Sequence, residues 1–153
     1  MNVVTVPRVG EAFTLALKDS SSPIRMVRDA GHEDWQRWKY MGTLINGVRT
    51  YTVKLIPAGP CINLKEAREI TEQLGGETLS GLILDSFYEA FPVVDDEGPI
   101  VVVDDSWLDP SKVRQFPIIF RRDAEPRWAR DFRPSLAALA ELHHGCRLLV
   151  GTP

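Results

Sequence analysis

The side chains best suited to chemistry are five aspartates between residues 95 and 109. This acidic cluster consists of Asp95, Asp96, Asp104, Asp105 and Asp109. Carboxylate oxygens are the ligands that Ca²⁺ and Mg²⁺ prefer, so one hypothesis is a divalent-metal-dependent hydrolase. The EF-hand alternation of ligands around a central glycine is missing, however, and aspartates at strand ends commonly form solvated turns. The pattern therefore favours turns over a Ca²⁺ or Mg²⁺ site.

The three histidines lack the spacing of a known metal or catalytic motif. His32 is followed by Glu33 and Asp34, but the second histidine of H-E-x-x-H is absent. His143 and His144 are neighbours in an expected helix, where adjacent side chains project about 100° apart and do not easily share a ligand. A catalytic role would require folding to bring a histidine beside the acidic cluster.

Nucleophilic and nucleotide-dependent chemistry have no support in the motifs. The chain contains no G-x-S-x-G, G-x-G-x-x-G or G-x-x-x-x-G-K-[ST] sequence. Cys61 follows a Pro-Gly-Pro turn and Cys146 lies in apolar company, so neither has the nearby base or helix N-terminus that activates a thiol. We expect both cysteines to be free thiols in a reducing compartment.

Aromatic residues support the leading hypothesis, a non-catalytic binding or protein-interaction domain. The candidate binding residues are Trp35, Trp38, Tyr40, Trp107 and Trp128. Tryptophans in loop-like stretches can mark a recognition surface, and they then line an exposed apolar patch. The alternative is that these large aromatics cover the ends of the core, because they supply much of its buried area.

Composition limits the partners and the location. The 153 residues carry a net charge of −3, and the arginines between residues 121 and 133 are interleaved with acidic residues, so nucleic acid is not an expected partner. The longest apolar runs fall far short of the roughly 20 residues of a membrane span, and no signal peptide is recognised. We expect a soluble cytoplasmic protein that binds a protein partner or associates with itself.

The N-terminal third predicts two β-hairpins. Residues 11–18 alternate between apolar and polar positions, and residues 24–28 are β-prone after a turn-forming stretch, so the two segments are expected to pair. Asn46-Gly47 is the preferred sequence of a type I′ turn, which would join strands at residues 40–45 and 48–56.

Two consecutive helices are expected in the middle of the chain. Asn63 can cap a helix over residues 64–74, with Gly75-Gly76 as its stop. A second helix is expected to begin at Thr78 or Ser80 and to end near Phe91.

The remaining segments predict strands at residues 93–94, 100–103 and 116–120, a helix at residues 134–143 and a terminal strand at residues 146–150. Pro117 suggests that residues 116–120 form an edge strand or a strand start. The expected fold is a single α+β domain over residues 1–153, with a mainly antiparallel sheet containing hairpins, a central helix pair, and a C-terminal helix followed by a strand.

The order of elements after Asn63 resembles C-type-lectin-like domains of the formylglycine-generating-enzyme type. The resemblance rests on a helix ending in Leu74-Gly75-Gly76, a second helix with a Phe-rich end, a long Trp-containing stretch and a final Gly-Cys-Arg-Leu-Leu-Val strand. Residues 77–80 read Glu-Thr-Leu-Ser where that family has an Arg-Leu-Pro-Thr signature, and no catalytic cysteine pair can be matched. The resemblance implies an alternative fold and no site residues.

Overall fold

The computed structural model describes most of the chain. The described residues are 5–17, 22–44, 47–58, 63–94, 98–122, 126–134 and 145–152. Asn46, Cys61, Asp95 and Asp96 lie outside them, as do residues 135–144, which include both neighbouring histidines and all but the first residue of the helix expected at residues 134–143. That first residue, Pro134, ends a strand, so the expected helix start is wrong.

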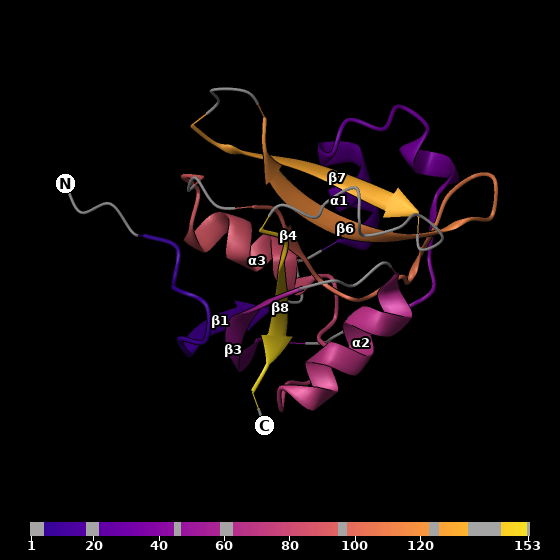
Figure 1. The fold of residues 1–153 in the computed structure, drawn as a ribbon. Coiled ribbons are helices and arrows are strands. Elements are labelled where there is room, and N and C mark those ends of the chain that lie inside the picture. Colours follow the sequence, from indigo (N-terminus) through magenta and orange to yellow (C-terminus); the bar gives the residue numbers. More distant parts are fainter. Residues whose placement is uncertain are drawn as a thin grey trace.

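A single eight-stranded sheet organises the described residues (Figure 1). Its strands run in the order β1-β3-β8-β4-β6-β5-β2, and β7 pairs with β6. The pairs are antiparallel except for the parallel pair β4 and β8, so the mainly antiparallel α+β fold is confirmed. The strands are β1 (Phe13–Leu17), β2 (Lys39–Tyr40), β3 (Arg49–Pro57), β4 (Ile100–Val101), β5 (Trp107–Leu108), β6 (Arg114–Arg121), β7 (Trp128–Pro134) and β8 (Arg147–Gly151).

Helices cover the two faces of the sheet and create two apolar cores. On one face, α3 (Ile83–Ala90) packs against β1 and β6, while α1 (Pro23–Asp29) packs against β2 and β7, and both helices contribute to one apolar core. On the other face, α2 (Leu64–Gln73) packs beside β8, as Figure 1 shows. The alternation of β8 serves both cores, because Leu149 faces the first while Leu148 and Val150 face the second. None of the described helices is long and apolar enough to cross a membrane.

The first expected hairpin is wrong, because residues 24–28 belong to helix α1. The Ser22 side chain accepts a hydrogen bond from the Arg25 amide at 3.2 Å, and Pro23 takes the first helical position. These two helix-start features outweigh the β-propensity of the segment. The helix buries Met26 and Val27 against the sheet.

The second expected hairpin is also wrong, although the strand after its turn exists. β2 pairs with β5, and β3 pairs with β1 and β8, so β2 and β3 are not neighbours. Gly47 has the positive φ, 81°, that a reversal of the chain requires. Burial against strands distant in the sequence, not the turn-forming dipeptide, determines which strands pair.

The central helix pair is confirmed, with a later start for its second member. Asn63 Oδ1 accepts from the Glu66 amide at 2.9 Å, and Gly75 ends α2 with φ 73°. The second helix, α3, begins at Ile83, not at Thr78 or Ser80. The reason is that Glu77 forms a β-bridge with Gly151, with both N–H to O=C distances at 2.8 Å, which holds the following residues extended.

The expected strands at residues 116–120 and 146–150 are confirmed, that at residues 100–103 is confirmed over Ile100–Val101, and residues 93–94 form no strand. Residues 116–120 lie inside β6, and residues 147–151 form β8 in the interior of the sheet. Val93 bridges to Arg127 and does not pair with the strand at residue 100. Pro117 lies in the middle of β6, which has neighbours on both sides, so the expectation of an edge strand or a strand start is wrong. The missing N–H of Pro117 is tolerated because β4 pairs with residues 118–119 and β5 with residues 114–115, so neither strand pairs with Pro117 itself.

Candidate binding site

The aromatic residues expected on an exposed patch mostly belong to the first core. Trp38, Trp107 and Trp128 are buried, and Trp107 has no exposed surface. Trp35 and Tyr40 are half-buried and pack against the same core. These three buried indoles therefore do not form the exposed apolar patch that was expected of a tryptophan recognition surface.

Each buried indole also has a hydrogen-bond partner for its N–H group. Trp107 Nε1 donates to the carbonyl of Pro23 at 2.8 Å, and Trp128 Nε1 donates to that of Phe91 at 2.7 Å. Trp38 Nε1 donates to Asp34 at 3.0 Å. The bonds of Trp107 and Trp128 attach α1 and the end of α3 to the sheet, and that of Trp38 closes a local turn, so the aromatic residues have a structural use.

The described members of the acidic cluster bind to the chain itself. Asp104 accepts from the Gly81 amide at 2.6 Å and from both the amide and the hydroxyl of Ser106. The Asp105 carboxylate forms an ion pair with Arg68 of helix α2, at a distance of 3.2 Å.

Asp109 closes the turn between β5 and β6. Its carboxylate accepts from the amides of Ser111 and Val113 at 2.8 and 2.9 Å, and from the Gln115 side chain at 2.9 Å. Within the described part of the chain, no group of three or more His, Cys, Asp or Glu residues could hold a metal ion. A Ca²⁺ or Mg²⁺ site stays a prediction that involves residues outside that part.

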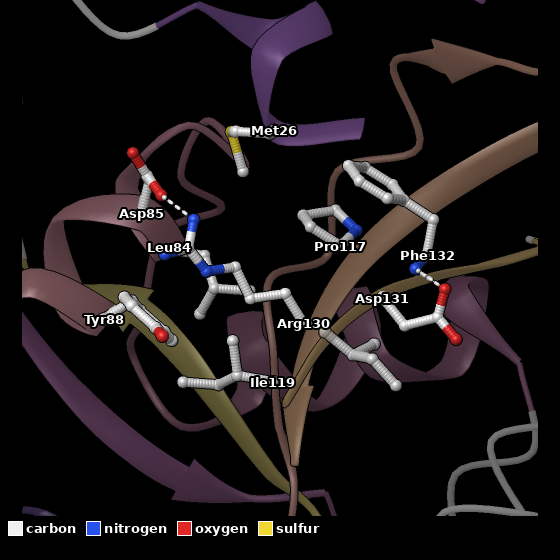
Figure 2. Close-up of a pocket in the computed structure, with 10 residues that line it drawn as sticks. Met26, Leu84, Asp85, Tyr88, Pro117, Ile119, Arg130, Asp131 and Phe132 are labelled. Atoms are coloured by element: carbon white, nitrogen blue, oxygen red, sulfur yellow. Dashed lines mark hydrogen bonds and ion pairs between the residues drawn. The ribbon is translucent and has the colours of Figure 1, made fainter. Parts of the chain in front are cut away.

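A pocket between α1, α3 and the β6–β7 hairpin gathers charged residues that the sequence did not connect. Figure 2 shows Arg130 reaching across this pocket to Asp85, with the ring of Tyr88 beside it. The guanidinium lies 3.2 Å from Asp85, 3.6 Å from Asp29 and 3.6 Å from the centroid of the Tyr88 ring. Burial raises the pKa of Asp85, and the Arg130 charge opposes that effect only in part.

The other charged group of this pocket, Asp131, is also fully engaged. It lies 3.1 Å from His32 Nε2, accepts from the Phe132 amide at 2.8 Å (Figure 2), and pairs with Arg133. Arg133 in turn donates to the Phe132 carbonyl at 3.3 Å. The charges of the pocket thus join α1, α3 and β7 to one another and leave no evident group for a ligand.

A second concave region, at the beginning of β3, has the opposite character. We call it the β3 groove; it holds about 990 Å³, including space open to solvent. Hydroxyl side chains dominate its walls, and Glu77 is its only acidic residue. The groove is lined by Thr50, Tyr51, Thr52, Glu77, Thr78, Leu79, Ser80, Gly151 and Thr152.

The groove exposes an unpaired length of β3. The Thr52 carbonyl accepts from Thr152 at 2.9 Å on the β8 side, whereas the Leu55 carbonyl accepts from Gly10 at 2.8 Å on the β1 side. Peptide groups alternate in direction along a strand, so those of Thr50 point the same way as those of Thr52. Because β8 ends at Gly151, opposite Val53, the N–H and C=O of Thr50 face the groove without a hydrogen-bond partner among the described residues.

Sequence reasoning missed this site because the site depends on unequal strand lengths. Along β3, Tyr51 and Val53 alternate with Thr50 and Thr52, so the two threonines lie on the other face of the strand. The free edge arises because the nine residues of β3 extend past the five residues of β8. No local pattern in the sequence carries that information.

Comparison of the chain with protein-family models, with curated proteins and with solved structures found no match. The likeness to C-type-lectin-like domains therefore remains a resemblance in the order of elements.

Proposed function

We propose that this chain is a non-catalytic protein-interaction domain that binds an extended peptide segment in the β3 groove. The observation that carries the proposal is the free N–H and C=O of Thr50 inside a concave, hydroxyl-lined site. A peptide strand that pairs with an open sheet edge gains backbone hydrogen bonds without requiring a particular side chain at every position.

The groove gives such a peptide two walls. One wall is the edge of β3 at Thr50. The other is the extended segment from Glu77 to Ser80, whose Thr78 and Ser80 hydroxyls can donate and accept hydrogen bonds.

Another exposed edge of the sheet is closed, which supports a special role for the open one. At β7, the side chains of Asp131 and Arg133 bind the N–H and C=O of Phe132. Side chains that cover the backbone groups of an edge strand prevent pairing with other chains. The outer edge of β1 is also uncovered at Thr14, but that residue lines neither concave region described above.

The partner is expected to be a protein in the cytoplasm. The net charge of −3 gives no attraction to a phosphate backbone, so nucleic acid is not proposed. A site that recognises backbone groups also suits a segment of a second copy of this chain. The measurements below distinguish a second copy from another protein.

The proposal is tested with peptides selected from a random-peptide display library on the full chain. Thr50→Pro removes the groove-facing N–H and breaks no hydrogen bond that joins two described residues. We expect it to weaken binding of the selected peptides about tenfold, measured by calorimetric titration. Thr50→Val keeps the N–H and removes only the hydroxyl, so it is expected to bind within about threefold of wild type.

Thr14→Pro is the matched control, because Thr14 is a threonine whose peptide groups face away from β3 at the outer edge of β1. It is expected to bind as wild type does. The proposal fails if no peptide is selected, if Thr50→Pro binds as tightly as wild type, or if Thr14→Pro causes the larger loss. A peptide from the chain itself among the selected sequences, together with a dimer in sedimentation, would identify a second copy as the partner and still support groove binding.

A further inference from the structure

One part of the β3 groove is hollow because a glycine forms its floor. Gly151, the last residue of β8, pairs with Val53 of β3 on one side and with Glu77 on the other. A Cβ added to Gly151 would lie 3.1 Å from the Leu79 side chain and 3.6 Å from the Cβ of Glu77. A larger residue at this position would therefore fill a space that the glycine leaves open. We call this space the Gly151 hollow.

An anionic and an aromatic side chain border the Gly151 hollow. Residues that pair directly, and residues two apart on one strand, share a face of the sheet. Glu77 therefore lies on the same face as Gly151, and so does Tyr51, which is two residues from Val53. Both residues line the β3 groove, where Glu77 is exposed and Tyr51 is half-buried.

The Glu77 carboxylate has a fixed origin and is available to a ligand. The N–H and C=O of Glu77 both bond to Gly151 at 2.8 Å, which fixes the position from which the side chain extends. Among the described residues no ion pair or hydrogen bond involves this carboxylate, whereas Asp85, Asp105 and Asp131 each pair with an arginine of the fold. Glu77 is also the only charged residue that lines the groove, so the groove is negatively charged.

The fold itself contains an example of what a carboxylate beside a tyrosine ring binds. In the pocket between α1, α3 and the β6–β7 hairpin, the Arg130 guanidinium lies 3.6 Å from the centroid of the Tyr88 ring and 3.2 Å from Asp85. Such a cation is attracted by the face of the ring and by the carboxylate, while its aliphatic stem covers apolar surface. Tyr51 and Glu77 offer the same two groups, and no cation–π contact or ion pair of the described residues uses either of them.

On the basis of the proposed function, we propose that the partner is an extended segment of another protein with an arginine or lysine that enters the Gly151 hollow between Tyr51 and Glu77. Side chains alternate along a strand, so the neighbour of the residue that pairs with Thr50 points to the face of Tyr51. Backbone pairing at Thr50 positions the segment, and the cation supplies its selectivity. Peptides selected on the wild-type chain are accordingly expected to share an Arg or Lys at a fixed position.

Charge and strand pairing favour another protein over a second copy of this chain. Each copy has a net charge of −3, so two copies repel each other. The arginine-rich stretch of the chain, residues 114–133, lies for most of its length in β6 and β7, which pair with each other. This stretch is therefore not available as an extended segment unless the sheet opens. A basic segment of a different protein meets neither obstacle.

The test measures by calorimetric titration how the selected peptides bind to Glu77→Gln, which removes the charge and keeps the shape of the side chain. We expect binding about fivefold weaker than to wild type, and affinity that falls less steeply with added salt, because the ion pair is lost. Glu72→Gln is the matched control, since Glu72 is also an exposed glutamate but lies on α2 outside the groove. It is expected to bind as wild type does.

Tyr51→Leu tests the aromatic side of the Gly151 hollow. Leucine keeps an apolar side chain and removes the face of the ring, so we expect the peptides to bind about threefold more weakly. Circular dichroism checks that the variant is folded, and Glu77→Gln keeps the test decisive if it is not.

A double-mutant cycle then connects Glu77 to the cation of the peptide. Replacing the shared basic residue by alanine should cost about tenfold on wild type and clearly less on Glu77→Gln. The inference is overturned if both proteins show the same loss, if the selected peptides share no basic residue, or if Glu72→Gln weakens binding as much as Glu77→Gln. Thr50→Pro reports separately on the groove, so these outcomes leave the proposed function standing. A wild-type dimer that becomes monomeric in Glu77→Gln would also overturn the inference, since a second copy would then occupy the hollow.

Discussion

At the scale of single residues, Arg130 is the clearest example of a charge used for structure. Its guanidinium connects the carboxylates of α1 and α3 while lying over the ring of Tyr88. A cation–π contact and two ion pairs on one side chain fix its position better than a single exposed salt bridge would. The arrangement has a free-energy cost at Asp85, because burial disfavours the charged form of its carboxyl group.

That cost predicts a pH dependence of stability. Because the folded protein holds the pKa of Asp85 above its usual value of 3.8, the wild-type chain loses stability as the pH rises from that value through the folded pKa. Asp85→Asn removes this titratable group. We expect the free energy of unfolding of Asp85→Asn to increase relative to that of wild type as the pH rises from about pH 3 to pH 7. Urea unfolding at several pH values measures the difference, and parallel curves for the two proteins would refute the prediction.

The described aspartates of the acidic cluster predict the behaviour of the chain toward cations. Asp104, Asp105 and Asp109 already accept hydrogen bonds or an ion pair from the chain. We expect millimolar Ca²⁺ or Mg²⁺ to leave Tm unchanged, since only a ligand that binds the native state raises it. A Tm that rises with cation concentration would contradict this prediction and support the hypothesis of a metal-dependent hydrolase.

At the scale of elements, Gly81 decides how closely the start of α3 approaches the sheet. A Cβ added there would lie 2.6 and 2.8 Å from ring atoms of Trp107 and 3.0 Å from Pro117. We expect Gly81→Ala to destabilise the protein by about 2 kcal/mol through overpacking. Thermal or urea unfolding gives the value.

Gly31→Ala provides the comparison for Gly81→Ala, because its Cβ would meet no atom within 4 Å. Its positive φ of 93° should cost only about 1 kcal/mol. Equal or smaller destabilisation by Gly81→Ala would show that the Trp107 ring moves aside.

The same scale shows what the sequence could predict. Helix α2 was predicted because its cap, Asn63, and its stop, Gly75, act within a few residues of the helix itself. Strand pairing was not, because it joins residues as far apart as Lys54 and Val150, whose contact depends on both cores. The β3 groove was missed for the same reason, since the free edge at Thr50 exists only once the order and lengths of the strands are known.

At the scale of the whole molecule, β8 is the strand that joins the two parts of the sheet. All five of its residues are buried, and it pairs with β3 on one side and β4 on the other. We expect the amides of Leu148 and Leu149 to exchange among the slowest, and those of the two-residue strand β2 among the fastest. Hydrogen exchange followed by mass spectrometry or NMR measures this order, and equal protection of β2 and β8 would contradict it.

The position of β8 also determines when the sheet can close during synthesis. β8 follows every other described strand in the chain, yet it lies between β3 and β4. While its residues are still inside the ribosome, the pair β1–β3 and the strands around β6 have no strand to connect them, and the edges of β3 and β4 are open. Pairing of this sheet can therefore be completed only after Gly151 has been synthesised, and until then the open edges of β3 and β4 are exposed to pairing with wrong partners.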